Sequence, residues 1–99
     1  MFEDTKIKQI KALLNFDTTK NMGSLIVDRE DVYFYVKEHG LPRNSQKSGE
    51  FSYRFHDGSW IIDYFEKGCN IGSQWVETEE EVLDVVLSSA MISYKRWNN

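Results

Sequence analysis

The sequence predicts an α+β fold: an N-terminal helix or helices, then a three-stranded antiparallel β-meander, then a long C-terminal helix packed on the sheet. Two observations support it. Hydrophobic residues recur at helical spacing near both ends of the chain, and they alternate with polar residues from 51 to 55. The chain has 99 residues, of which 40% are hydrophobic, so we expect one domain with one core.

The first predicted helix covers residues 3–15. Ile7, Ile10 and Leu13 recur at helical spacing, and lysines fill the polar side. The segment that follows is polar and irregular, up to about residue 23. Residues 24–27 are either a buried strand or the lead into the next element.

A second helix is predicted from about residue 29 to residue 39. Asp28 is suited to cap its first turn, and Gly40 followed by Pro42 is typical of a helix end. The run from 32 to 36 consists of β-favouring residues, so a strand is the alternative here. Residues 43–49 contain no hydrophobic side chain and are predicted to be a solvated loop.

The meander occupies residues 50–77. Turns are predicted at Asp57-Gly58 and Lys67-Gly68, because tight hairpin turns favour residues that tolerate positive φ. The strand from 60 to 65 is hydrophobic on both faces, so we expect it in the middle of the meander.

The last predicted helix runs from about residue 79 to residue 96. Thr78 and Glu81 have the spacing of a capping box. The buried stripe is predicted to consist of Val82, Leu83, Val86, Leu87, Ala90, Tyr94 and Trp97.

Charge is distributed unevenly along the chain. Residues 1–48 have a net charge of +1, whereas residues 49–99 have a net charge of −5. Acidic surfaces disfavour nucleic acid, whose binding depends on Lys and Arg, and favour a basic protein partner. The alternative, which involves no partner, is that the acidic residues only keep the protein soluble.

The residues suited to catalysis do not form a recognisable set. His39 and His56 are predicted at a helix end and beside a turn, and Cys69 lacks a basic neighbour other than Lys67. We therefore expect no enzymatic activity, no metal and no cofactor. A single cysteine, no export signal and no hydrophobic run long enough to span a membrane favour a cytoplasmic protein without membrane contact.

The order of several motifs resembles small bacterial immunity proteins of polymorphic-toxin systems. The motifs are Trp60, Tyr64-Phe65-Glu66-Lys67-Gly68, Trp75 and Thr78-Glu-Glu-Glu-Val, within residues 50–90. The chain has Lys67 where those proteins commonly have Arg, and Val82 where they commonly have a small residue. The resemblance implies a protein that binds and inhibits a cognate toxin domain. That domain would be basic if it acts on nucleic acid.

The predicted binding residues combine acidic groups with an aromatic one, as interface hot spots often do. They are Asp57, Asp63, Phe65, Glu66, Glu79 and Glu80. If they do not bind, the loop at 43–49 and the exposed face of the second helix are the next candidates. The alternative function is a small regulatory or adaptor module that binds another protein or forms a homodimer.

Overall fold

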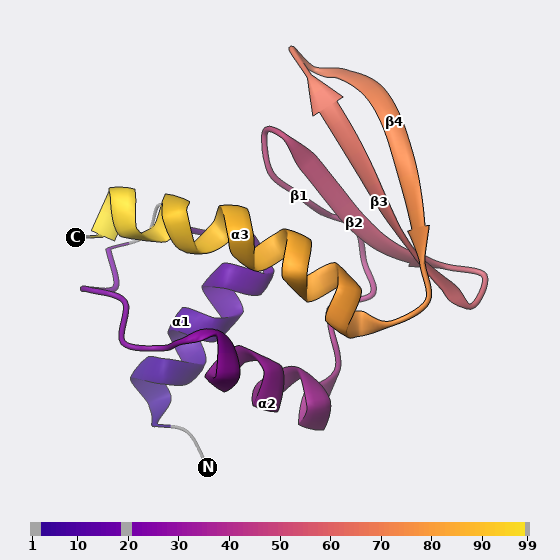
Figure 1. The fold of residues 1–99 in the computed structure, drawn as a ribbon. Coiled ribbons are helices and arrows are strands. Elements are labelled where there is room, and N and C mark those ends of the chain that lie inside the picture. Colours follow the sequence, from indigo (N-terminus) through magenta and orange to yellow (C-terminus); the bar gives the residue numbers. More distant parts are fainter. Residues whose placement is uncertain (1–2, 19–20, 99) are drawn as a thin grey trace.

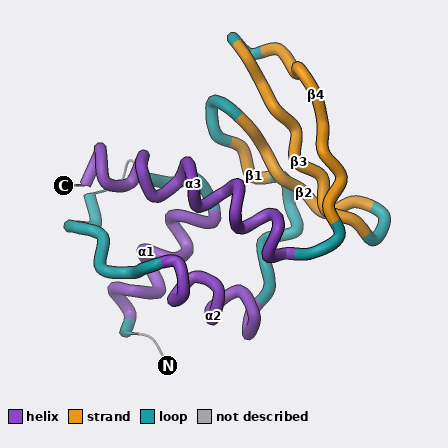
Figure 2. Tube along the Cα trace, viewed as in Figure 1, coloured by secondary structure: helices purple, strands orange, loops and turns teal. Residues whose placement is uncertain are grey.

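The computed structural model describes residues 3–18 and 21–98, and within them three helices and a four-stranded antiparallel sheet form two layers (Figure 1). The helices are α1 (Asp4–Leu14), α2 (Arg29–His39) and α3 (Glu79–Asn98). The strands are β1 (Gln46–Lys47), β2 (Phe51–His56), β3 (Ser59–Glu66) and β4 (Cys69–Val76), adjacent in that order. The helices lie to one side of the sheet, and β4 forms an outer edge (Figure 2). The predicted α+β class is therefore confirmed.

The prediction of three strands is wrong by one, because the loop at 43–49 contains β1. Gln46 pairs with Tyr53 and Lys47 pairs with Ser52, so this strand extends the sheet beyond β2. Strand pairing uses backbone groups, and a segment without hydrophobic side chains can therefore still join a sheet edge. The Ser48 amide completes the connection by donating to the Phe51 carbonyl at 2.8 Å.

Strand β3 lies between β2 and β4, as predicted. Trp60 and Ile62 belong to the core shared with the helices, whereas the equally buried Ile61 points to the opposite face of the sheet. Two tight turns connect β3 to its neighbours, and both have positive φ at the predicted residues: Asp57 and Lys67, each followed by Gly.

Helix α2 forms at residues 29–39 instead of the alternative strand, because both of its ends are capped. The Asp28 carboxylate accepts from the Asp31 amide at 2.9 Å, and the Asp31 carboxylate accepts from the Asp28 amide at 3.1 Å. At the other end, Gly40 has φ of 78° and donates its amide to the Val36 carbonyl at 2.7 Å. These bonds satisfy backbone groups that a helix otherwise leaves free.

Helix α3 packs on the sheet and against α1 and α2. Six residues of its predicted stripe are buried: Val82, Leu83, Val86, Leu87, Ala90 and Tyr94. The side chain of Trp97 lies outside the described residues. The predicted capping box is half formed. The Glu81 amide donates to the Thr78 hydroxyl at 3.3 Å, whereas the Glu81 carboxylate accepts from that same hydroxyl.

Residues 24–27 do not form a strand, because a buried side chain of α1 binds the backbone of this segment. The Gln9 amide group donates to the Ser24 carbonyl at 3.0 Å, and its oxygen accepts from the Ile26 amide at 2.9 Å. Gln9 is 1% exposed, so these bonds satisfy a buried polar group as well as the loop. Among the described residues, no helix is long and hydrophobic enough to cross a membrane.

Candidate functional site

A groove of about 610 Å³ lies between α2 and the first turns of α3. Its lining residues are Glu30, Tyr33, Phe34, Val36, Lys37, Glu79, Glu80, Leu83 and Asp84, and we call this site the acidic groove. Val36 and Leu83 belong to the buried core, so the bottom of the groove is hydrophobic. The four carboxylates outnumber the single lysine, so the lining carries an excess of negative charge.

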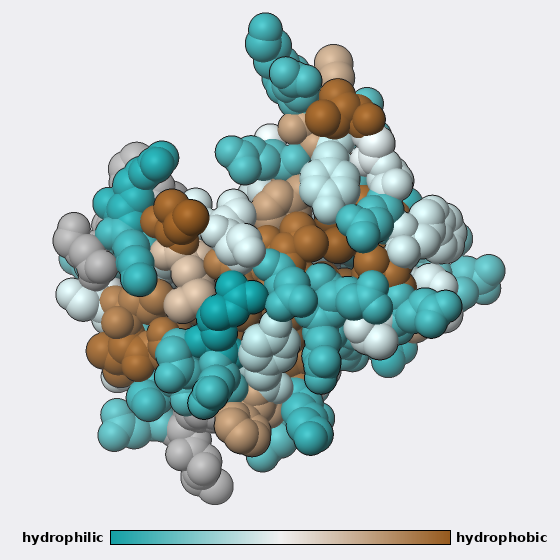
Figure 3. Space-filling view, in the orientation of Figure 1, coloured by the Kyte–Doolittle hydropathy of each residue, from teal (hydrophilic) through white to brown (hydrophobic). Residues whose placement is uncertain are grey.

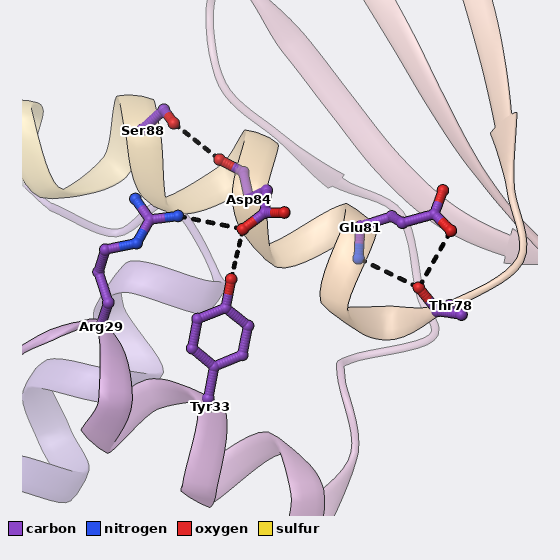
Figure 4. A network of polar contacts seen from close by, with 6 residues as sticks. All are labelled: Arg29, Tyr33, Thr78, Glu81, Asp84 and Ser88. Atoms are coloured by element: carbon purple, nitrogen blue, oxygen red, sulfur yellow. Dashed lines mark hydrogen bonds and ion pairs between the residues drawn. The ribbon is translucent and has the colours of Figure 1, made fainter.

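A polar network connects the two helices at the Asp84 end of the acidic groove (Figure 4). The Tyr33 hydroxyl of α2 donates to the Asp84 carboxylate of α3, and Arg29 donates to the same carboxylate oxygen at 3.2 Å. The hydrogen bond to Asp84 raises the pKa of Tyr33, because that carboxylate favours the protonated phenol. The network fixes the spacing of the helices at this end of the groove.

Glu79 connects the helices at the other end. Its carboxylate accepts from the Leu41 amide at 3.3 Å, just beyond the end of α2. One carboxylate oxygen of Glu79 is therefore already hydrogen-bonded within the protein, whereas Glu80 is exposed to solvent. Both residues lie in the first turn of α3, where negative charge is favourable because of the helix dipole.

Phe34 is the most exposed hydrophobic residue of the groove, at 62%. Val32 and Val36 are buried one turn apart on the inner side of α2, so a residue midway between them must point outward. An exposed aromatic ring beside carboxylates is a typical anchor for a protein partner. In the space-filling view, hydrophilic side chains predominate over the region where α2 and the first turns of α3 lie (Figure 3).

Of the six predicted binding residues, the structure places Glu79 and Glu80 in the acidic groove. Asp57 and Glu66 lie at or next to the two tight turns at opposite ends of β3, so they cannot act together with each other. Both are exposed. The predicted set therefore does not form one site.

Asp63 and Phe65 lie on the sheet face that points away from the helices. The residues of this open sheet face are Lys47, Ser52, Arg54, Ile61, Asp63, Phe65, Ser73 and Trp75. The Lys47 ammonium lies 4.6 Å from the centre of the Phe65 ring, in the geometry of a cation–π contact. Phe65 is thus already in contact with a cation of its own chain.

Asp63 is mostly buried and bonded within the sheet, so it is not available to a partner as the predicted binding set requires. Its side chain is 13% exposed and accepts from Ser73 at 2.5 Å and from Arg54 at 3.3 Å. These bonds, that from Ser73 foremost, lower the pKa of Asp63 although partial burial opposes them. Its negative charge is therefore largely neutralised within the sheet.

The predicted binding set did not name Glu30, Tyr33, Phe34 and Asp84, although the exposed face of the second helix, the next candidate, includes Glu30 and Phe34. The available signal was Phe34, because an aromatic residue outside the buried stripe of a helix must face solvent. The pairing of α2 with α3, which brings Glu30 near Asp84, depends on tertiary structure. Across the described part of the chain, no three His, Cys, Asp or Glu side chains are grouped as metal ligands would be.

Comparison of the chain with protein-family models, with curated proteins and with solved structures found no match.

Proposed function

We propose that this protein binds and neutralises a basic protein partner through the acidic groove, as immunity proteins do with their cognate toxins. The observation that carries the proposal is Phe34, which is 62% exposed in a groove whose lining has four carboxylates and one lysine. A hydrophobic anchor within an acidic rim fits a partner segment that presents a hydrophobic side chain flanked by Lys or Arg.

The chemistry of the groove favours fast association. Its carboxylates are only partly compensated, since Arg29 and Tyr33 bind Asp84 while Glu80 stays exposed. An uncompensated field of this kind steers a basic partner toward the groove and weakens as salt rises. The resemblance of residues 50–90 to immunity proteins supports the same function, which involves no catalysis.

The test starts from any toxin-like gene that neighbours the one encoding this chain, and its product is expressed in a bacterial cell with and without the chain. Co-expression of the chain should restore growth, and the two proteins should purify together. The variant Phe34→Ala should lose most of the protection, because the groove loses its anchor.

Ile92→Ala is the matched control, since Ile92 is also on a helix, is 63% exposed and does not line the groove. It should protect as well as the wild type. Equal protection by Phe34→Ala and Ile92→Ala would rule out the groove, and failure of the wild-type chain to bind the neighbouring gene product would rule out the function.

A second candidate function is a small adaptor module that associates with itself. The observation that favours it is the free edge of β4, which bears no charged residue. A self-associating chain that binds no neighbouring gene product would support this alternative.

A further inference from the structure

Strand β4 is a long, exposed sheet edge. It is the last strand in the order β1-β2-β3-β4 and has eight residues, of which all but Val76 are exposed. Ile71 and Trp75 are each 62% exposed. A sheet edge of this length offers a row of backbone donors and acceptors to another strand.

The pairing register shows which backbone groups of β4 are free to pair. The Phe65 amide of β3 donates to the Glu50 carbonyl at 2.7 Å, so Phe65 directs its backbone groups toward the β2 side. Backbone direction alternates along an antiparallel strand, and Ile62 and Tyr64 therefore direct theirs toward their β4 partners Gln74 and Gly72. By the same alternation, Ser73 and Trp75 direct their amides and carbonyls outward.

The two edges of the sheet differ in how they are protected. β1 is only two residues long and includes Lys47, and both features discourage pairing with another strand. β4 has neither charge nor proline. It contains a bulge opposite Tyr64 and Phe65, but the register from Gly72 to Val76 is regular.

We propose that β4 pairs antiparallel with β4 of a second copy of this chain, which joins two sheets edge to edge. A strand that pairs antiparallel with itself is related to its copy by a two-fold axis, so Ser73 and Trp75 meet matching donors and acceptors. The inference deepens the second candidate function, because both rest on the β4 edge, and it does not depend on the acidic groove.

A second copy suits this edge because β4 is uncharged and an antiparallel copy of the strand complements it. Two molecules with a net charge of −4 repel each other as a whole, but the uncharged strands meet without like charges opposite one another. The antiparallel arrangement also brings the Lys67 end of one strand near the Glu77 end of the other. The exposed Trp75 and Ile71 then lose solvent contact to the copy.

The assembly closes as a dimer, because the short β1 edge with Lys47 does not offer a second pairing site. One pair of edge strands buries a small interface, so we expect a weak dimer that forms between micromolar and millimolar protein.

Sedimentation velocity and amide hydrogen exchange over that concentration range test the proposal on the wild-type chain. The sedimentation coefficient should rise toward that of a dimer as concentration increases. Exchange of the Ser73 and Trp75 amides should slow over the same range, whereas the Gln74 amide, which faces β3, should be protected throughout.

Trp75→Asp and Ile71→Asp should each abolish the dimer, because they add a negative charge to the paired edge of two acidic molecules, and Ile71 lies near the strand end that carries Glu77 in the copy. Ile92→Asp is the control, since Ile92 is 63% exposed but lies on α3 and does not line the acidic groove. A circular dichroism melt verifies that each variant folds, and if Trp75→Asp does not fold, Ile71→Asp alone tests the dimer. A wild type that stays monomeric, or a dimer in which Ser73 and Trp75 exchange freely, would overturn the inference.

Discussion

The acidic groove and the open sheet face contain similar side chains but use their charges differently. On the open sheet face, Asp63 is bonded to Arg54 and Ser73, and Lys47 lies over Phe65. In the acidic groove, four carboxylates face one lysine, and Phe34 is left exposed. Both regions expose one large aromatic ring, Trp75 on the sheet face and Phe34 in the groove. The charges of the sheet face are paired with one another or with an aromatic ring, whereas the groove has an excess of negative charge available for a partner.

The difference shows that net charge along a sequence does not locate the charge that acts on a partner. The acidic half of the chain, residues 49–99, includes Asp63, which is neutralised within the sheet. The groove, in contrast, takes Glu30 from the half with a net charge of +1. Folding pairs some charges and gathers others of one sign, and the gathered charges contribute most to the local field that steers association.

The largest expected effect concerns the core that both regions share. Val86 is fully buried in α3, so Val86→Asp should unfold the domain, because an unpaired buried charge costs about 3–5 kcal/mol. That is comparable to the roughly 5–15 kcal/mol of stability that a small domain has. Ile92→Asp, on the 63% exposed residue of the same helix, is the control and should melt near the wild type. A cooperative melt of Val86→Asp within a few degrees of the wild type would contradict the packing of α3.

A smaller effect is expected on the open sheet face. Asp63→Asn should lower the free energy of unfolding by about 1–3 kcal/mol at neutral pH, since it disturbs bonds from Ser73 and Arg54 to a mostly buried carboxylate. Urea denaturation measures this difference.

The pH dependence gives a second readout for Asp63. The pKa of Asp63 is lower in the folded protein than in the unfolded chain, where it is about 4. The ionised carboxylate therefore contributes its full stabilisation above about pH 4, and this stabilisation is lost as the pH falls below that value. The difference in free energy of unfolding between the wild type and Asp63→Asn should therefore become smaller below about pH 4. A gap that stays constant from pH 7 to pH 3 would show that the ionised carboxylate is not what stabilises the sheet.

The smallest effect is expected at the carboxylate that joins the helices. Asp84→Asn should cost about 1 kcal/mol or less, because the Asp84 side chain is 65% exposed and solvent screens its pairing with Arg29. The same urea experiment at neutral pH compares it with Asp63→Asn. If Asp84→Asn lowers the free energy of unfolding as much as Asp63→Asn does, the charges of the two regions are equally bonded and the proposed difference between the regions is wrong.

The elements could be predicted from sequence where local signals are strong. The helix at residues 29–39 follows from Asp28 and Gly40, and the strand order from the two turns and the hydrophobic strand between them. Strand β1 could not be predicted, because Gln46 and Lys47 pair through backbone groups that leave no side-chain pattern. The absence of a strand at 24–27 depends on Gln9, a polar residue in a helix core that no periodicity argument singles out.

The candidate site could be predicted only in part. Glu79 and Glu80 were correctly predicted to lie in the first turn of a helix, because the capping signal at Thr78 places both there. Glu30 and Asp84 belong to separate helices, and their proximity to one groove depends on how α2 packs against α3. Asp63 was predicted to bind a partner, but its carboxylate is bonded within the sheet. The alternation of residues along the strand shows which face Asp63 lies on, but it does not show that Ser73 and Arg54 bind its carboxylate there.

The most direct test of the account is the association rate at low salt between the chain and the basic protein partner that we propose, measured for Glu80→Lys and Glu66→Lys. Both substitutions reverse one exposed glutamate, but Glu80 lines the acidic groove and Glu66 borders the β3–β4 turn. Glu80→Lys should slow association severalfold more than Glu66→Lys, and the gap should shrink as salt rises. Equal rates for the two variants, or a slower rate for Glu66→Lys, would contradict the acidic groove as the binding site.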